Sequence, residues 1–374
     1  MDAEREAVLE FTDVTGRIRQ CKVLSARSVA TGDEEPLRVI DLEVETGEDG
    51  AEPLRLTQRS VPRAAGARDP ALYDRLEQEV RIALALRRRF ASTGHPRELA
   101  RVIGYDLDGD EPFVLFEAFR GDPASHVAGR LVLDELRAFQ TGLLRGVRIL
   151  EQVGVVHRGI TPDSVRWDGS GVQLTCFDLA MLAGRRRTPA GRRPWAAPQQ
   201  RMGKGWAESR DDVWSAGMVI YHVATATPAD ELDRAPDLSA AEPRTRALLA
   251  GVFGERAVDR PTPAELLERL GAVDPLPPPE EAPDPLFEIG GHRFDEMMRQ
   301  KWGKSYVPPR VPVDPVGRDA DEPAPAPRTP ETRPFAPPPE PAPAASGAPR
   351  SITVAALVAV AVLALALIVM GGLM

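Results

Sequence analysis

The chain has 374 residues and a formal net charge of −9 at pH 7, an acidic excess that gathers between residues 33 and 52. Because nucleic-acid binding requires a basic face, this balance argues against a nucleic-acid partner. The two cysteines, Cys21 and Cys176, lie far apart, give no disulfide framework and suit a reducing cytoplasm.

The N-terminal part predicts strands followed by an amphipathic helix. Residues 54–61 read as a strand that carries Arg59. A helix begins at Asp69-Pro70. Its apolar residues fall on one stripe at helical spacing: Leu72, Leu76, Val80 and Ala83. No G-x-G-x-x-G sequence occurs between residues 11 and 42, so we expect no glycine-rich loop to cover phosphates there.

The following part predicts helices. One helix leads into residues 157–164, as shown by apolar residues at helical spacing: Leu136, Phe139, Leu143, Val147 and Leu150. Residues 213–223 are apolar almost all round, which is typical of a helix buried on every side. Residues 262–265 read Thr-Pro-Ala-Glu, a capping box that opens a final helix.

Residues 157–164 read His-Arg-Gly-Ile-Thr-Pro-Asp-Ser and resemble the catalytic loop of protein kinases, His-Arg-Asp-x-Lys-Pro-x-Asn. Four further blocks resemble kinase segments in the same order: the metal-binding turn at 172–180, the end of the activation loop at 195–199, the central helix at 209–221 and the Arg-Pro-Thr signature at 259–262. The chain is thus similar to the bacterial serine/threonine kinase family, and its Ala-, Arg- and Pro-rich composition is typical of a high-GC bacterium.

This resemblance implies an α+β, bilobal protein-kinase-like fold over residues 8–273. The β-rich N-lobe is expected at about 8–118 and the helical C-lobe at about 119–273. One transmembrane helix is expected after the domain, as argued below.

The resemblance also marks what the catalytic loop lacks. Gly159 stands where the family has the Asp that accepts the substrate hydroxyl proton. Thr161 replaces the family's Lys, and Ser164 replaces the Asn that holds a magnesium ion. Two nearby carboxylates could stand in for the base, but we expect Asp163 to face solvent and Asp168 to form an ordinary turn. We therefore expect no catalytic residue in this loop.

The nucleotide-binding positions that the resemblance implies are altered as well. Arg59, or Gln58 beside it, stands in place of the strand lysine, and Glu79 falls where the regulatory helix carries its glutamate, so Arg59 could pair with Glu79. At the metal-binding turn the letters align Cys176 with the family's Asp and Asp178 with its Gly. We adopt this register, in which a thiolate is a poor Mg²⁺ ligand, although a slip of two residues would make Asp178 the ligand. A bound nucleotide would be assigned to Arg59, Glu79 and Asp178.

A basic cluster at 185–187 and 192–193 lies in the activation-loop region and reads as a solvated loop. The alternative is a docking place for a phosphorylated or acidic partner. In that alternative Thr188 is a regulatory target of another kinase, and neighbouring arginines that include Arg158 hold its phosphate.

After residue 273 the composition changes. Residues 274–351 are proline-rich and predict an extended, largely disordered linker. The linker contains an island at 286–306 with apolar residues near helical spacing: Phe294, Met297, Met298 and Trp302. We favour docking of this island back onto the C-lobe over recognition of another protein.

Residues 352–370 are an uncharged, apolar stretch that is long enough to span a bilayer as a helix. Arg350 precedes it, and the positive-inside rule then places the kinase-like domain in the cytoplasm. We expect a tail anchor that passes once through the cell membrane.

These observations predict a membrane-tethered pseudokinase that acts as a scaffold or allosteric partner in cytoplasmic phospho-signalling. Its partners would be the membrane and proteins such as an active kinase or a phosphorylated protein. Two alternatives stay open: a nucleotide-binding sensor without turnover, and an atypical serine/threonine kinase that uses ATP. We assign no cofactor and no metal to the first interpretation, whereas ATP and Mg²⁺ belong to the alternatives.

Overall fold

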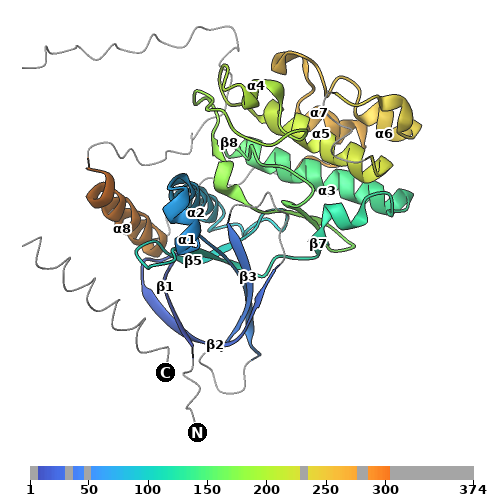
Figure 1. Cartoon of the computed structure of the whole chain (residues 1–374). Coiled ribbons are helices and arrows are strands. Elements are labelled where there is room, and N and C mark those ends of the chain that lie inside the picture. Colours follow the sequence, from blue (N-terminus) through green and yellow to red (C-terminus); the bar gives the residue numbers. More distant parts are fainter. Residues whose placement is uncertain (1–6, 30–36, 46–51, 228–234, 276–284, 304–374) are drawn as a thin grey trace, which may run out of the picture. The chain divides into compact units, whose positions relative to one another are not determined.

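The computed structural model describes residues 7–29, 37–45, 52–227, 235–275 and 285–303. All of them belong to one compact unit, Met1–Ala320. The second unit, Asp321–Met374, lies outside the described residues. The described part begins with a barrel and continues into a mainly helical region (Figure 1).

Six antiparallel strands close into the barrel (Figure 1). In their order around the barrel they are β1 (Val8–Asp13), β2 (Ile18–Ser28), β3 (Arg38–Val44), β4 (Leu54–Ser60), β6 (Phe113–Glu117) and β5 (Val102–Asp106). The strand expected at 54–61 is β4. Helices α1 (Arg63–Arg68) and α2 (Ala71–Arg89) connect β4 to β5, and α2 is the amphipathic helix expected after Asp69-Pro70.

Strand β1 closes the barrel because it pairs with a neighbouring strand and with a distant one. Phe11 pairs with Arg19 of β2, and on the other edge Thr12 pairs with Tyr105 of β5. Gly104 permits this approach, since a Cβ atom there would lie 2.3 Å from the Phe11 ring. Phe11 packs in the smaller of two apolar cores with five other buried side chains: Leu42, Val44, Leu56, Phe113 and Leu115. The amino-acid sequence alone did not indicate this closure.

The helical region follows the barrel. Its helices are α3 (Leu133–Gln152), α4 (Pro198–Arg201), α5 (Ser209–Thr225), α6 (Pro243–Leu248) and α7 (Pro263–Arg269). Its short strands are β7 (Asp122–Pro123), β8 (Val155–Val156), β9 (Val165–Trp167), β10 (Val172–Leu174) and β11 (Met181–Leu182). They form a sheet in the order β10-β9-β7 and a pair β11-β8. Single 3-10 turns occur at η1 (Ala124–Val127), η2 (Phe177–Leu179), η4 (Leu238–Ala240) and η5 (Ala257–Asp259).

Two predictions for the helical region are confirmed. Every residue of α5 from Asp211 to Tyr221 is buried, as the apolar run indicated. The capping box forms at the start of α7: the backbone N–H of Glu265 donates to Thr262 Oγ1 at 3.2 Å, and the N–H of Thr262 donates to Glu265 Oε2 at 2.7 Å. Helix α5 supports the segment that begins at His157, through Asp212.

Helix α8 (Pro285–Trp302) ends the described part and contains most of the island expected at 286–306. Its Phe294 ring meets the ring of Tyr105 in β5, and Met298 is fully buried. The expected docking onto the C-lobe is therefore wrong. The helix packs on the barrel and α2 (Figure 1), because its Phe294 and Met298 are buried in the larger apolar core there.

The predicted linker beyond residue 303 and the predicted membrane span at 352–370 lie outside the described residues. Within the described part, none of the helices has the length and apolar character needed to cross a bilayer.

Candidate functional site

A buried network of charged side chains connects the barrel to the helical region. Arg59 on β4 forms an ion pair through Nη1 with Glu79 Oε2 on α2, and both side chains are fully buried. The second Glu79 oxygen, Oε1, accepts a hydrogen bond from the backbone N–H of Phe177 at 3.0 Å. The expected pairing of Arg59 with Glu79 is thus formed, and Glu79 holds the turn that follows β10.

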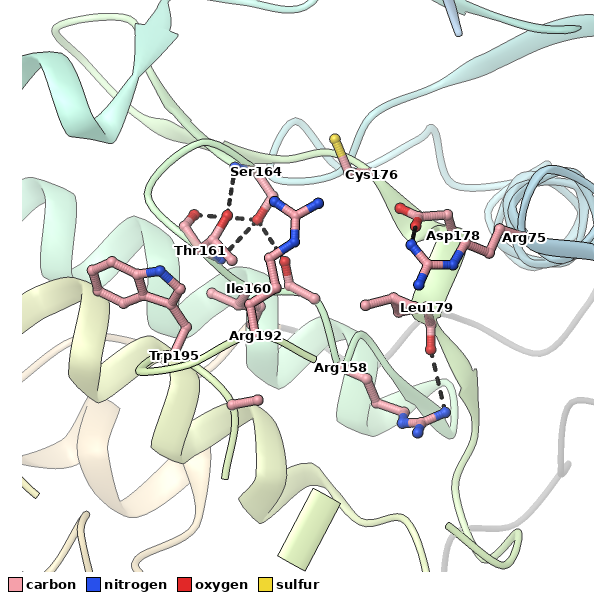
Figure 2. Close-up of a pocket in the computed structure, with 12 residues that line it drawn as sticks. Arg75, Arg158, Ile160, Thr161, Ser164, Cys176, Asp178, Leu179, Arg192 and Trp195 are labelled. Carbon is pink, nitrogen blue, oxygen red and sulfur yellow. Dashed lines mark hydrogen bonds and ion pairs between the residues drawn. The ribbon is translucent and has the colours of Figure 1, made fainter. Parts of the chain in front are cut away.

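Asp178 joins the same network. Its Oδ1 lies 3.4 Å from Arg59 Nη2. Its Oδ2 lies 4.0 Å from Arg75 Nη1, and Figure 2 draws this second pair. The planar guanidinium of Arg59 reaches two carboxylates at once, which the compact ammonium of a lysine does not do in a fixed geometry. The structure therefore brings together all three residues that the sequence assigned to nucleotide binding.

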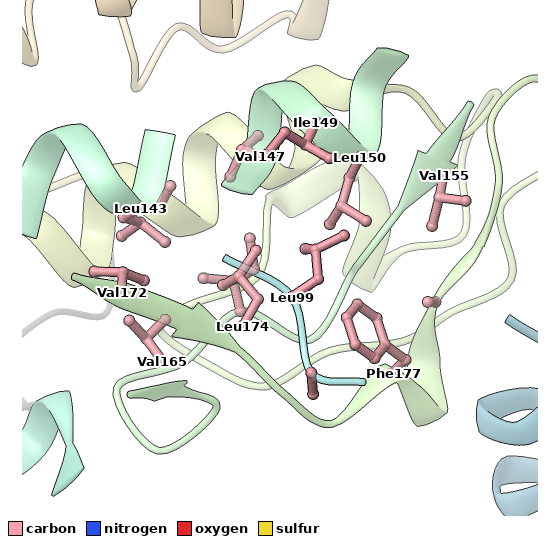
Figure 3. Close-up of a cluster of buried hydrophobic side chains, with 14 of the residues drawn as sticks. Leu99, Leu143, Val147, Ile149, Leu150, Val155, Val165, Val172, Leu174 and Phe177 are labelled. Atoms are coloured by element: carbon pink, nitrogen blue, oxygen red, sulfur yellow. The ribbon is translucent and has the colours of Figure 1, made fainter. Parts of the chain in front are cut away.

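The turn at 176–180 is fixed by its central aromatic residue. Phe177 is fully buried in the larger apolar core, together with Leu150, Val155 and Leu174 (Figure 3). Its ring lies 4.9 Å from that of His157. Cys176 precedes it in a left-handed conformation, with φ 66°. Because Phe177 is held from inside, Cys176 and Asp178 on either side of it both line the pocket of Figure 2.

The catalytic-loop segment is held by the central helix. Asp212 of α5 accepts hydrogen bonds from the backbone N–H groups of His157 and Arg158, at 2.6 and 2.8 Å. The His157 ring bonds to the carbonyl oxygen of Thr175 at 2.9 Å. Burial raises the pKa of Asp212 to about 7 and lowers the pKa of His157 to about 4, so the imidazole is neutral at pH 7.

The three replaced positions of this loop bond to one another. Ser164 Oγ donates to the carbonyl of Gly159 at 2.9 Å and accepts from the backbone N–H of Thr161 at 2.9 Å. The N–H of Ser164 donates to Thr161 Oγ1 at 3.3 Å. These hydroxyl groups satisfy the loop's own backbone, and Gly159 brings no side chain to the pocket.

The two carboxylates that could replace the missing base have structural partners, as expected. Asp163 is exposed and accepts a hydrogen bond from Ser125 Oγ at 2.9 Å. Asp168 accepts from the backbone N–H groups of Ser170 and Gly171 at 2.9 and 2.8 Å, and these bonds lower its pKa against a desolvation effect. Neither residue lines the pocket of Figure 2.

Thr188 lies against Arg158, as the sequence analysis supposed. Arg158 Nη2 donates to the carbonyl oxygen of Thr188 and lies 3.4 Å from its Oγ1. The neighbouring Arg187 is buried and paired with Asp211 at 2.8 Å, so not all of the basic cluster is solvated. The regulatory role of Thr188 stays a prediction.

The pocket between these elements is small, with a volume of about 30 Å³. Its lining includes three arginines and one carboxylate: Arg75, which pairs with Asp178, Arg192, and Arg158, whose guanidinium is turned to the carbonyl oxygen of Leu179 (Figure 2). Arg75 was not predicted as a residue of the site, although it stands four residues before Glu79 and so shares a face of α2. Arg75 and Arg192 outnumber the one carboxylate of the lining, Asp178, which favours an anionic group in this pocket over a cation.

Comparison with known proteins supports a protein-kinase-like family. The chain is 26% identical over 223 residues to CBL-interacting protein kinase 29 of Oryza sativa subsp. japonica, covering 58% of this chain and 45% of that protein. It is 29% identical over 216 residues to CBL-interacting protein kinase 20 of the same plant, covering 54% and 41%. It is also 28% identical over 152 residues to serine/threonine protein kinase OSK3 of Oryza sativa subsp. indica, covering 40% and 29%.

The chain thus spans less than half the length of each of these relatives. No family model matches the chain. The three relatives are named as protein kinases, one of them as a serine/threonine kinase, and they agree with a kinase-like fold for the barrel and the helical region described above.

Proposed function

We propose that this chain is a pseudokinase: a kinase-like protein that transfers no phosphoryl group and acts as a scaffold or allosteric partner in phospho-signalling. The catalytic loop carries the proposal. Asp212 holds this loop in place through two backbone hydrogen bonds, yet the loop presents Gly159 where a general base is required. A base must reach the proton that it removes, and glycine has no group that could do so.

A magnesium ion, which the kinase resemblance implies, does not fit the side chains of the pocket. Mg²⁺ prefers carboxylates together with phosphate oxygens. Cys176 offers a thiol, and Asp178 is already flanked by the guanidinium groups of Arg59 and Arg75. A divalent cation beside Asp178 would meet both positive charges. Among the described residues, no three His, Cys, Asp or Glu side chains gather as a metal site. We derive no metal-assisted step.

The proposal includes a location and a class of partner. We infer that residues 352–370 anchor the protein once in the cell membrane, with the kinase-like domain in the cytoplasm, since the stretch is uncharged and follows Arg350. Its partners would be an active kinase or a phosphorylated protein. The bacterial branch of the family stays a prediction from composition.

A pair of assays on the full chain tests the absence of catalysis. Transfer of radiolabelled phosphate from ATP to the chain or to a generic protein substrate should stay at background. The melting temperature should not change when MgCl₂ is added to ATP. A ligand at about 100 times its dissociation constant stabilises the folded state by about 2.7 kcal/mol, so Mg²⁺-dependent binding would be plain in the melting curve. A magnesium-dependent shift accompanied by labelled product would refute the proposal.

The partner role is tested at Thr188. Incubation with an active serine/threonine kinase should place phosphate on Thr188, detected by mass spectrometry, because Arg158 lies beside it to hold the added charge. Partner capture should then rise with phosphorylation in the wild type and not in Thr188→Ala. Equal capture by the two proteins would count against a switch at this residue.

A second candidate function is a sensor that binds an anionic ligand such as a nucleotide without turnover. Arg75 and Arg192 in the lining of the pocket favour it. Arg59 and Glu79, in contrast, are fully buried in their ion pair, so they would act on the ligand only through Asp178. For this candidate, ATP alone raises the melting temperature as much as ATP with Mg²⁺.

A further inference from the structure

Helix α8 packs along one face against the barrel and α2. Gly290, Phe294, Met298 and Trp302 follow one another at intervals of four residues, which places them on the same face of a helix. Phe294 is 4% exposed and Met298 is fully buried. The Phe294 ring meets Tyr105 edge-on, with ring centroids 5.5 Å apart. Trp302 is 45% exposed, so the covered part of this face runs from Gly290 to Met298.

The N-terminal half of α8 lies close to the turn between β1 and β2. A Cβ atom at Gly290 would lie 2.5 Å from the carbonyl oxygen of Val14, so only glycine allows the approach. Arg293 Nη1 donates to the carbonyl oxygen of Gly16 at 2.7 Å. The helix is thus held to the barrel by backbone proximity and a charged hydrogen bond.

The C-terminal end of α8 holds α2 through one carboxylate. Lys301 Nζ donates to Glu77 Oε1 at 2.7 Å, and Trp302 Nε1 donates to Glu77 Oε2 at 3.0 Å. The Glu77 side chain is 6% exposed. A nearly buried carboxylate requires such partners, because removing its hydrogen bonds leaves a charge away from water. Both oxygens of Glu77 therefore depend on α8.

The opposite side of α2 carries the contacts to the pocket. Glu77 and Glu79 point about 200° apart around the helix axis, since each residue turns an α-helix by roughly 100°. Glu79 binds Arg59 and the N–H of Phe177, and Gln78 Nε2 donates to the carbonyl oxygen of Ala180 at 2.8 Å. Helix α2 is thus clamped between α8 and the turn at 176–180.

We propose that α8 is a latch: by holding Glu77 it keeps α2 in the position that closes the turn at 176–180, and its departure loosens that turn and opens the pocket. The chain segment that continues from residue 303 is thereby coupled to the pocket, because a pull on that segment or capture of α8 by another protein acts on α2 first. The latch rests on the α8–α2 contacts and does not depend on the proposed function.

Cys176 reports the state of the turn. It lines the pocket and is half-buried, so the rate at which N-ethylmaleimide labels it follows opening of the turn. The full chain with Cys21→Ser leaves Cys176 as the one thiol. Labelling is followed by mass spectrometry, with amide hydrogen exchange of α2 and α8 measured on the same proteins.

Met298→Ala and Lys301→Ala should each raise the labelling rate of Cys176 about tenfold, because local opening no longer has to break the α8 contact. Hydrogen exchange in α2 should rise with it. Glu296→Ala, on the exposed face of α8, is the matched control and should change the rate less than about twofold. Glu77→Gln keeps the shape and weakens the charged hydrogen bonds, so it tests the latch without a cavity.

Two results would overturn the latch. In the first, α8 exchanges faster in Met298→Ala and Glu77→Gln while Cys176 labelling and α2 exchange stay at the wild-type level. In the second, Leu267→Ala, which removes a buried side chain of α7 away from α2, raises Cys176 labelling as much as Met298→Ala does. That outcome would show general loosening and no coupling through α2.

Discussion

The charged network around α2 and the catalytic loop depart from the kinase pattern in different ways. In the network, a charged residue stands in for a charged residue: Arg59 takes the lysine position and pairs with Glu79 and Asp178. In the loop, the kinase resemblance implies that charge is lost, since Gly159 stands for an Asp and Thr161 for a Lys. The loop nevertheless keeps its support from Asp212. Shape and chemistry are therefore carried by different residues.

The difference has a physical reason. A buried cation that loses its partner leaves an uncompensated charge in the interior, so the network tolerates only exchanges that keep its charges balanced. The loop has no such requirement at its tip, where small hydroxyl groups can satisfy the backbone. The supporting contacts are thus present in both regions: the Arg59–Glu79 ion pair in the network and the Asp212 hydrogen bonds under the loop.

The largest expected effect comes from breaking the network. Glu79→Gln should lower the free energy of unfolding by about 3–5 kcal/mol, because it leaves the buried Arg59 charge with reduced compensation. Urea unfolding measures the change. The double variant Arg59→Met/Glu79→Leu should recover only part of it, because Asp178 and the backbone N–H of Phe177 then lose a partner. Glu117→Gln, in an exposed pair with Arg101, should cost less than about 1 kcal/mol. Equal effects at both glutamates would contradict the contrast.

Removing the support of the loop should come next. Asp212→Ala leaves two buried backbone N–H groups, those of His157 and Arg158, without their acceptor. We expect a loss of about 2–4 kcal/mol, since each unsatisfied group costs on the order of 1–3 kcal/mol. Urea unfolding is the measurement, with Asp163→Ala in the exposed part of the loop as the control. Two indistinguishable unfolding curves would remove Asp212 from its supporting role.

The pH dependence of the free energy of unfolding distinguishes the buried histidines from the buried Asp212. Burial lowers the pKa of His157 and of His95 to about 4, below the ordinary 6.5. The unfolded chain therefore binds protons that the folded protein excludes, and these groups lower stability as the pH falls from 6.5 to 4. Burial raises the pKa of Asp212 from 3.8 to about 7. Its contribution has the opposite sign: it is greatest at low pH and is lost as the pH rises from 4 to 7.

Asp212→Asn removes the opposing contribution and keeps a side-chain oxygen that accepts one hydrogen bond. Between pH 6.5 and 4.5 the variant should lose stability more steeply than the wild type, by about 1.4 kcal/mol per pH unit for one proton. Urea unfolding at four pH values gives both slopes. Parallel slopes would mean that Asp212 is ionised in the folded protein throughout this range.

The smallest expected effect comes from restoring the loop alone. At Gly159 a Cβ atom would have only ordinary contacts, the nearest being His157 Nδ1 at 3.5 Å, so Gly159→Asp/Ser164→Asn should fold. We expect no phosphate transfer in the radiolabel assay, because Cys176 and Arg59 still leave no magnesium site. Phosphate transfer by this double variant would show that the replaced residues of the loop are sufficient to explain the absence of activity.

The parts of the fold that the sequence predicted are those with short-range signals. The apolar run of α5, the capping box at Thr262 and the stripe of α2 are each legible within about fifteen residues, and each forms as expected. Closure of the barrel was missed because β1 and β5 pair across some ninety residues of intervening chain. No local pattern encodes such a partner.

In the candidate site, too, some contacts could be predicted from the sequence and others could not. The pairing of Arg59 with Glu79 followed from the kinase resemblance, as did the place of Thr188 beside Arg158. The place of Arg75 in the lining of the pocket was not predicted, since an arginine in an amphipathic helix is usually expected to face solvent. The surface on which α8 packs was also predicted wrongly. Apolar residues such as Phe294 and Met298 indicate that one face of the helix is buried, but they do not identify the surface that buries it.

The closed barrel limits how this region can meet other proteins. A strand at the rim of an open sheet exposes backbone donors and acceptors to which an extended peptide can add. In the barrel each described strand has a neighbour on both sides, so no such rim is left. A protein that binds the barrel must therefore contact its side chains. Such binding depends on complementary shape and charge, and an extended peptide cannot bind there by adding a strand.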